Sequence, residues 1–214
     1  MAGLRKARIG RRALLFAMPW LLAAHLATLR AAELYSEDAI KAAYLYRFAG
    51  YVEWPPQAQS TSTFTIAVLG GEAVAAQLER LLPGRLINGH PAQVRVIHSV
   101  RELEDAQMLY IGPGYPGNVR AVLAAIETRP ILTVTDDERG LDDGGIINFV
   151  EAEQRVRFEV SLVASARSHL TISSQLLSVA ARVQGGRLHT QASCPSADFT
   201  GWSDLHCPLR MARG

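Results

Sequence analysis

Apolar residues in the middle of the chain recur with two alternating periods, which predicts strands that alternate with helices. The mostly apolar run Phe64 to Leu69 is typical of a buried strand, and Glu72 to Leu82, after Gly70-Gly71, has the spacing of a helix. We expect further strands at 94–97, 108–111 and 131–134, a short helix opened by the Ser99 and Glu102 capping box, and a helix at 119–126. This alternation favours a parallel sheet with helices on both faces.

Aromatic side chains are concentrated in the first expected helix. Ser36 can cap this helix, apolar residues then recur at three- and four-residue spacing up to Val52, and Trp54-Pro55-Pro56 ends it. Aromatic residues lie around most of its circumference, and they are Tyr44, Tyr46, Phe48, Tyr51 and Trp54. Two interpretations stay open: all of them belong to the core, because Tyr and Trp tolerate partial burial, or some of them form a recognition surface.

The last third of the chain changes to a period of two. Apolar residues from Val156 to Leu162 alternate with polar ones that include Arg157 and Glu159, so one face of this strand is expected to be exposed to water. Together with the preceding apolar run at 146–150, this strand predicts an antiparallel hairpin that completes the edge of the sheet.

A final helix is expected after this hairpin. Ser173 or Ser174 can cap it, its apolar residues run from Leu176 to Val183, and Gly185-Gly186 stops it. The whole pattern predicts an α/β fold: a single three-layer domain with a mostly parallel central sheet, helices on both faces and an antiparallel edge hairpin. The chain then divides into an N-terminal signal, this domain and a C-terminal tail, at residues 1–32, 33–186 and 187–214.

Charge divides the chain at the first of these boundaries. The formal net charge is +2, from 22 Lys or Arg and 20 Asp or Glu, but residues 1–32 hold six of the basic residues and no acidic one. The rest of the chain therefore has 16 basic and 20 acidic residues, a net charge of −4. An acidic body loses the main electrostatic support for binding nucleic acid or an anionic membrane.

The N-terminal segment has the layout of a secretory signal. A cationic stretch precedes an apolar run from Ala13 to Leu29, and the small pair Ala31-Ala32 follows. The apolar core of this run is shorter than the roughly 20 residues that span a bilayer. Cleavage is expected near Ala32, although Arg30 fits the −3 position of that site poorly. A cleaved signal predicts a periplasmic protein; an uncleaved anchor and a twin-arginine signal are the alternatives.

The two cysteines, Cys194 and Cys207, both lie in the C-terminal tail. An even number of cysteines in an exported chain is typical of a disulfide, and this one would close a 14-residue loop. Such a loop contributes about 3 kcal/mol in the chain-entropy account of disulfide stabilisation. Free thiols, or zinc bound with His189 and His206, are the alternatives, but the spacing matches no short zinc knuckle.

Motifs of catalysis and of cofactor binding are missing from the sequence. It contains no G-x-S-x-G elbow, H-E-x-x-H pair, P-loop or G-x-G-x-x-G, so we expect no catalytic residue, metal or cofactor. A small-ligand crevice is one alternative, because Gly70, Gly71, Gly112 and Asp136 follow expected strands at the edge where open α/β sheets bind ligands. Tight turns at the glycines and a solvated loop at Asp136 are the interpretations that we favour for these residues.

Six segments of the chain together resemble the YfiR family of periplasmic proteins. Each segment is weak evidence alone, but all six occur in the same order behind an export signal, between about residues 38 and 184. The similar segments are 39–55, 64–70, 131–136, 144–149, 157–160 and 172–177.

This resemblance implies a regulator without enzymatic activity. The best-known member of the family is a periplasmic repressor that holds an inner-membrane diguanylate cyclase inactive by contacting its periplasmic domain. An OmpA-like outer-membrane lipoprotein relieves the repression by sequestering the repressor, and the family is described as a dimeric α/β fold, so a homodimer is expected. The best-known member has disulfides within its folded domain, whereas residues 33–193 contain no Cys here, so redox control through the core is not expected.

The sequence therefore leads to one hypothesis and two alternatives. The hypothesis is a repressor of a diguanylate cyclase that lowers cyclic di-GMP and biofilm formation. Its expected contact residues are Tyr44, Tyr46, Tyr51, Trp54, Arg157 and Glu159. The first alternative is a binding protein for a nucleotide or an amino acid, with a site at Gly70, Gly71, Gly112 and Asp136. The second is a periplasmic hydrolase whose catalytic residues come from distant parts of the chain and leave no motif.

Overall fold

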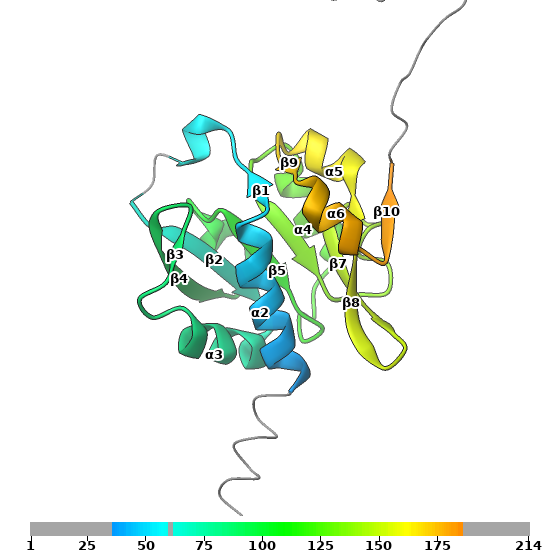
Figure 1. The fold of residues 1–214 in the computed structure, drawn as a ribbon, viewed down its shortest axis with the longest axis horizontal. Helices are drawn as coiled ribbons and strands as arrows, with labels where there is room; N and C mark the ends of the chain where they lie inside the picture. Colours follow the sequence, from blue (N-terminus) through cyan, green and yellow to red (C-terminus); the bar gives the residue numbers. More distant parts are fainter. Residues whose placement is uncertain (1–35, 60–61, 186–214) are drawn as a thin grey trace, which may run out of the picture.

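Eight strands form the central sheet, in the order β10-β8-β7-β6-β5-β2-β4-β3 (Figure 1). The computed structural model describes residues 36–59 and 62–185. The expected signal at 1–32 and the expected Cys194–Cys207 disulfide lie outside the described residues.

The middle of the sheet is parallel, as the alternation of strands and helices predicts. Its parallel strands are β4 (His90–Ile97), β2 (Phe64–Leu69), β5 (Met108–Ile111), β6 (Leu132–Thr135) and β7 (Ile147–Ala152). Antiparallel neighbours occur towards both edges, where β7 pairs with β8 (Arg155–Ser161) and β4 with β3 (Leu86–Ile87). The turn between β3 and β4 is Asn88-Gly89, the turn expected from the sequence.

Helices cover both faces of this sheet, so the three-layer α/β prediction is confirmed. One face packs against α2 (Glu37–Ala49), α3 (Glu72–Leu81), α5 (Leu162–Arg167) and α6 (Ser174–Val179). The other face packs against α4 (Val119–Ile126) and the 3₁₀ helix η2 (Val100–Leu103). Because side chains alternate along a strand, Ile66 and Val68 of β2 belong to the first core, whereas Ala67 and Leu69 belong to the second.

The helix α2 begins where the sequence predicts. The Ser36 hydroxyl accepts a hydrogen bond from the amide of Ala39 at 3.2 Å, and two acidic residues in the first turn complement the helix dipole. The helix ends at Ala49, earlier than expected, because Val52 leaves it to form β1 (Val52–Glu53). β1 pairs with β9 (Thr171–Ile172) in a separate two-stranded sheet, and the 3₁₀ helix η1 (Pro56–Gln59) follows.

The C-terminal part differs from the prediction in two ways. The β7–β8 hairpin is antiparallel as expected, but β10 (Arg182–Gln184) pairs in parallel with β8 and takes the edge position. Ser173 caps α6 as expected, but this helix ends at Val179 and Val183 lies in β10. The β-branched Val183 favours a helix only weakly, so pairing with the distant strand β8 decides its structure.

The expected capping box forms only in part. The hydroxyl of Ser99 hydrogen-bonds the Glu102 carboxylate at 2.9 Å and makes no bond to a helix amide. The segment is accordingly a single 3₁₀ turn. Among the described residues, no helix has both the length and the apolar content to cross a membrane.

Candidate functional site

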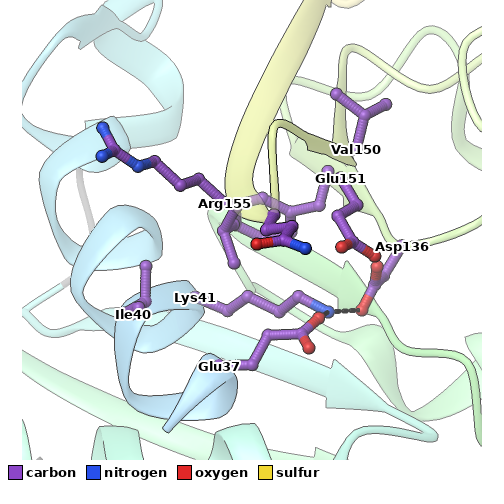
Figure 2. A pocket seen from close by; sticks show the side chains of 10 residues that line it. Glu37, Ile40, Lys41, Asp136, Val150, Glu151 and Arg155 are labelled. Atoms are coloured by element: carbon purple, nitrogen blue, oxygen red, sulfur yellow. Dashed lines mark hydrogen bonds and ion pairs between the residues drawn. The ribbon is translucent and has the colours of Figure 1, made fainter. Parts of the chain in front are cut away.

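Two hollows flank α2, one near its beginning and one at its end. The first, here called the α2–hairpin cavity, has a volume of about 600 Å³ and lies between α2, the residue after β6, and the β7–β8 hairpin (Figure 2). Its lining consists of Glu37, Ile40, Lys41, Asp136, Phe149, Val150, Glu151, Gln154, Arg155 and Val156. The second, here called the α2–β3 groove, has a volume of about 320 Å³ and is lined by Tyr46, Arg47, Gly50, Tyr51, Leu86, Ile87 and Asn88.

A buried ion pair lies on the wall of the α2–hairpin cavity. The Nζ atom of Lys41 is 2.5 Å from Oδ2 of Asp136 and 2.6 Å from Oε1 of Glu37, and Figure 2 shows Lys41 extending from α2 towards Asp136. The side chains of Lys41 and Asp136 are only 8% and 16% exposed. Burial lowers the pKa of Lys41, but the hydrogen bonds and charges of Asp136 and Glu37 outweigh it and raise that pKa above its usual value. The ammonium therefore stays charged at neutral pH.

Lys41 carries a sequence signal of its own, outside any catalytic or cofactor motif. Lys6 and Lys41 are the only lysines in a chain whose other 20 basic residues are Arg. Lys41 also follows Glu37 by four residues, the spacing at which side chains on one helix face meet. The pairing with Asp136 spans 95 positions, so no local pattern predicts it.

Tyr110 holds Asp136 from the core side of the sheet. Its side chain is fully buried, and its hydroxyl donates to Oδ2 of Asp136 at 3.0 Å. Burial, and then the negative charge of Asp136, raise the pKa of Tyr110 far above its usual value, so the phenol stays a neutral donor. Oδ2 of Asp136 thus binds both Lys41 and Tyr110, while no described residue donates a hydrogen bond to Oδ1.

A buried polar cluster fixes the loop that presents Asp136. The hydroxyl of Thr135 donates to Oδ1 of Asn148 at 2.7 Å, and the amide of Asp137 lies 3.4 Å from the same oxygen. Gly140 packs against both side chains: a Cβ atom there would lie 2.1 Å from the Thr135 hydroxyl and 2.2 Å from Asn148 Oδ1. The position of the Asp136 carboxylate is therefore set by residues that do not touch the cavity themselves.

In the Tyr110→Phe variant, the free energy of unfolding should fall less steeply as the pH rises above about 10. Because folding raises the pKa of Tyr110, the unfolded chain releases this proton above about pH 10 while the folded protein keeps it. The free energy of unfolding should then fall by about 1.4 kcal/mol per pH unit from this group, and Lys41, whose pKa is also raised, adds a fall of the same sign. Urea unfolding between pH 9 and 11.5 measures both slopes; an identical slope in Tyr110→Phe contradicts the prediction.

The glycines expected to form a ligand crevice instead allow two loops to pack closely against each other. A Cβ atom on Gly112 would lie 2.4 Å from the carbonyl oxygen of Gly70, and one on Gly71 would lie 2.5 Å from the Tyr110 ring. Gly70 has a φ of +67°, which other residues rarely adopt. These positions bring the loops after β2 and β5 into contact, and of the four candidate ligand residues only Asp136 lines the cavity.

The aromatic residues of the first helix separate into core and surface. The Tyr44 ring packs on Phe48 and Phe158 with centroid distances of 5.6 Å each, so it lies at the margin of the core. Trp54 is only 4% exposed, stands edge-on to Phe64 and donates from Nε1 to the carbonyl of Gln107. The core interpretation therefore holds for Trp54, which offers no surface to a partner.

Tyr46 and Tyr51 do line a surface hollow, the α2–β3 groove. Leu86 joins them there and is 58% exposed, one of the few large apolar side chains that the described residues leave open to water. The guanidinium of Arg85 lies 5.1 Å from the centroid of the Tyr46 ring, and Arg47 lines the groove beside it. Aromatic, aliphatic and cationic side chains thus meet in one place.

Arg157 and Glu159 lie on β8, at the opposite end of the sheet from this groove. Glu159 forms a bidentate ion pair with Arg182 of β10: Nε donates to Oε1 at 2.9 Å and Nη2 donates to Oε2 at 2.7 Å. The exposed Arg157 is 3.5 Å from the carbonyl oxygen of Val179. The six candidate contact residues consequently do not form one continuous surface.

The part of the chain that the structure describes contains no candidate metal site. Within residues 36–59 and 62–185, no group of three His, Cys, Asp or Glu side chains is placed to hold a metal ion.

Comparison with known proteins gives a family match and distant likenesses to solved structures, including two at 12% identity. The family described as YfiR/HmsC-like matches residues 38–181. A conserved domain protein from Vibrio cholerae O1 biovar eltor has a TM-score of 0.46 at 12% identity, over 70% of this chain and 60% of that one. The ABC domain in complex with L-Trp from Streptococcus pneumonia has a TM-score of 0.39 at 12% identity, over 59% and 57%. Both scores are too low to transfer a ligand or an activity, and no curated protein matches the chain.

Proposed function

Since the chain belongs to the YfiR/HmsC-like family, whose members are periplasmic regulators, we propose that it represses an inner-membrane diguanylate cyclase by binding the periplasmic domain of that enzyme. The observation that carries this proposal is the family match over residues 38–181. Release of the repressor would raise cyclic di-GMP and favour biofilm formation. A cleaved signal at 1–32, a homodimer and an OmpA-like outer-membrane lipoprotein that sequesters the repressor belong to the same proposal.

The α2–β3 groove is the contact surface that supports this function best. Binding energy at protein interfaces is concentrated in Tyr, Trp and Arg side chains that fill pockets near the centre of the contact. Tyr46, Tyr51 and the exposed Leu86 provide such anchors, and Arg47 and Arg85 provide charge at the same place. Arg157 offers a second, separate contact on β8.

The Tyr46→Ala variant should bind the periplasmic domain of the cyclase about tenfold more weakly, the loss of more than 1 kcal/mol that defines an important interface residue. Arg157→Ala should show a smaller loss, because an exposed charge contributes little. The matched control is Arg101→Ala, an exposed residue of η2 on the other face of the sheet. Biolayer interferometry with the purified domain measures affinity. A fall in melting temperature that accompanies weaker binding would assign Tyr46 to the fold instead.

Repression itself is tested in the cell. Deleting the gene should raise cyclic di-GMP in a strain that expresses the cyclase, the wild-type gene should restore the original level, and Tyr46→Ala should restore it less well. An unchanged cyclic di-GMP level after deletion contradicts the proposed function whatever the binding experiment shows.

A second candidate function, small-ligand binding, is favoured by the α2–hairpin cavity. Its volume of about 600 Å³ lies within the range of roughly 300 to 1,000 Å³ that small-molecule sites occupy. It also lies at the carboxyl end of β6, on the edge where open α/β sheets bind their ligands.

A further inference from the structure

The walls of the α2–hairpin cavity combine an apolar surface with charged groups. Ile40 of α2 and Phe149, Val150 and Val156 of the hairpin supply the apolar part, and Ile40 is itself partly exposed. Such a wall suits the hydrocarbon body of a small molecule, while a few polar groups at fixed positions orient it.

The charged groups around the cavity are mainly acidic. Glu37, Asp136 and Glu151 come from three separate elements, namely α2, the residue after β6, and β7. The two basic residues are Lys41, which is already bound by Glu37 and Asp136, and Arg155. Figure 2 shows the Arg155 guanidinium extending away from the Lys41–Asp136 pair. The cavity therefore carries an excess of negative charge.

Two of the acidic groups have acceptor capacity left. Glu151 is exposed and makes no ion pair within the part of the chain that the structure describes. Oδ1 of Asp136 receives no hydrogen bond from those residues either, although Oδ2 receives two. A carboxylate gains most from a charged donor, because charge-assisted hydrogen bonds are about twice as strong as neutral ones.

Lys41 shows which chemistry this wall stabilises. Its ammonium sits between two carboxylates and lies 6.0 Å from the centroid of the Phe149 ring. The same cavity wall thus already holds one alkylammonium group, and the carboxylate of Glu151 and the free oxygen of Asp136 remain for another.

We propose that the α2–hairpin cavity binds a small organic cation, an amine carried on an apolar body. The amine is bound by Glu151 and Asp136, and the apolar body lies against Ile40, Phe149 and Val156. An anionic ligand such as a nucleotide is disfavoured, because the three carboxylates of the lining outnumber its two cations, and one of these cations, Lys41, is already paired. The site is distinct from the α2–β3 groove and does not depend on the proposed repression.

Three probes of similar shape test this proposal: cyclohexylmethylamine, cyclohexylmethanol and cyclohexanecarboxylate, which are cationic, neutral and anionic. In the chain without the proposed signal at 1–32, labelling with ¹³C,¹⁵N-lysine gives signals from Lys41 alone, because the other lysine, Lys6, lies in that signal. The amine should shift the Lys41 signals with a Kd of about 1 mM or below, an ordinary affinity for so small a ligand. The alcohol should bind at least about tenfold more weakly, and the carboxylate should not saturate.

The variant Glu151→Gln should weaken binding of the amine about tenfold while leaving the melting temperature unchanged, because this side chain is exposed and unpaired in the described structure. Glu153→Gln is the matched control: it removes an equal charge two residues away, outside the cavity lining, and should leave the Kd unchanged. Equal losses in both variants would mean a diffuse charge effect and overturn the proposal. Tighter binding of the carboxylate, or no saturation by any probe up to about 10 mM, overturns it as well.

Discussion

The Phe48→Ala variant is expected to lose about 3 to 5 kcal/mol of the free energy of unfolding. Phe48 is fully buried, and its ring lies 4.8 Å from the Phe158 centroid and 5.8 Å from the Phe149 centroid. Truncation to Ala removes these aromatic contacts and leaves a cavity between α2 and the β7–β8 hairpin, which close-packed neighbours refill only in part.

Urea unfolding of the variant and the parent chain measures this loss. Tyr44→Phe is a suitable control, because it keeps the neighbouring ring and removes only a hydroxyl at the margin of the same cluster. Its free energy of unfolding should change by no more than about 0.5 kcal/mol. A loss below about 1.5 kcal/mol in Phe48→Ala would show that the cluster does not hold α2 on the sheet.

Removing the carboxylate from the buried ion pair should have the next largest effect. We expect Asp136→Ala to lower the free energy of unfolding by about 3 kcal/mol, the lower end of the range for breaking a buried pair, because Glu37 still contacts the Lys41 ammonium. The same change leaves the buried Tyr110 hydroxyl without its acceptor.

The double variant Lys41→Met with Asp136→Ala shows how much of the lost stability comes from leaving the Lys41 charge unpaired and how much from lost packing. It should recover part of the loss, because no uncompensated charge then remains in the site, and a double-mutant cycle gives the coupling between the two side chains. Glu127→Ala breaks an exposed pair with Arg167 for comparison and should cost at most about 1 kcal/mol. If Asp136→Ala behaves like Glu127→Ala, the Lys41–Asp136 pair does not stabilise the fold.

Local sequence patterns predicted the elements whose signals are complete within a few residues. β2, β5 and α4 have the predicted bounds, because each is an apolar or amphipathic run between turn residues. β10 and the β1–β9 pair were missed, since two or three residues form a strand only when a distant strand offers hydrogen bonds.

The candidate site shows the same limit more sharply. Asp136 was found because its place after an apolar strand puts it at the ligand-binding edge of the sheet, but its partner Lys41 is 95 positions away. The aromatic helix could be recognised, yet the partial exposure of Tyr46 and the burial of Trp54 depend on the position of β3 and of the residues after α2. Spacing along one helix carries no information about those neighbours.

The 13-residue helix α2 touches both hollows, since Glu37 and Lys41 in its first half line the cavity and Tyr46 and Arg47 near its end line the groove. A helix of this length is about 20 Å long, so one short element separates the two hollows. Any coupling between them is reciprocal: if a cavity ligand weakens partner binding by some factor, the partner weakens binding of the ligand by the same factor. The occupancy of the cavity would thus report on the state of the groove.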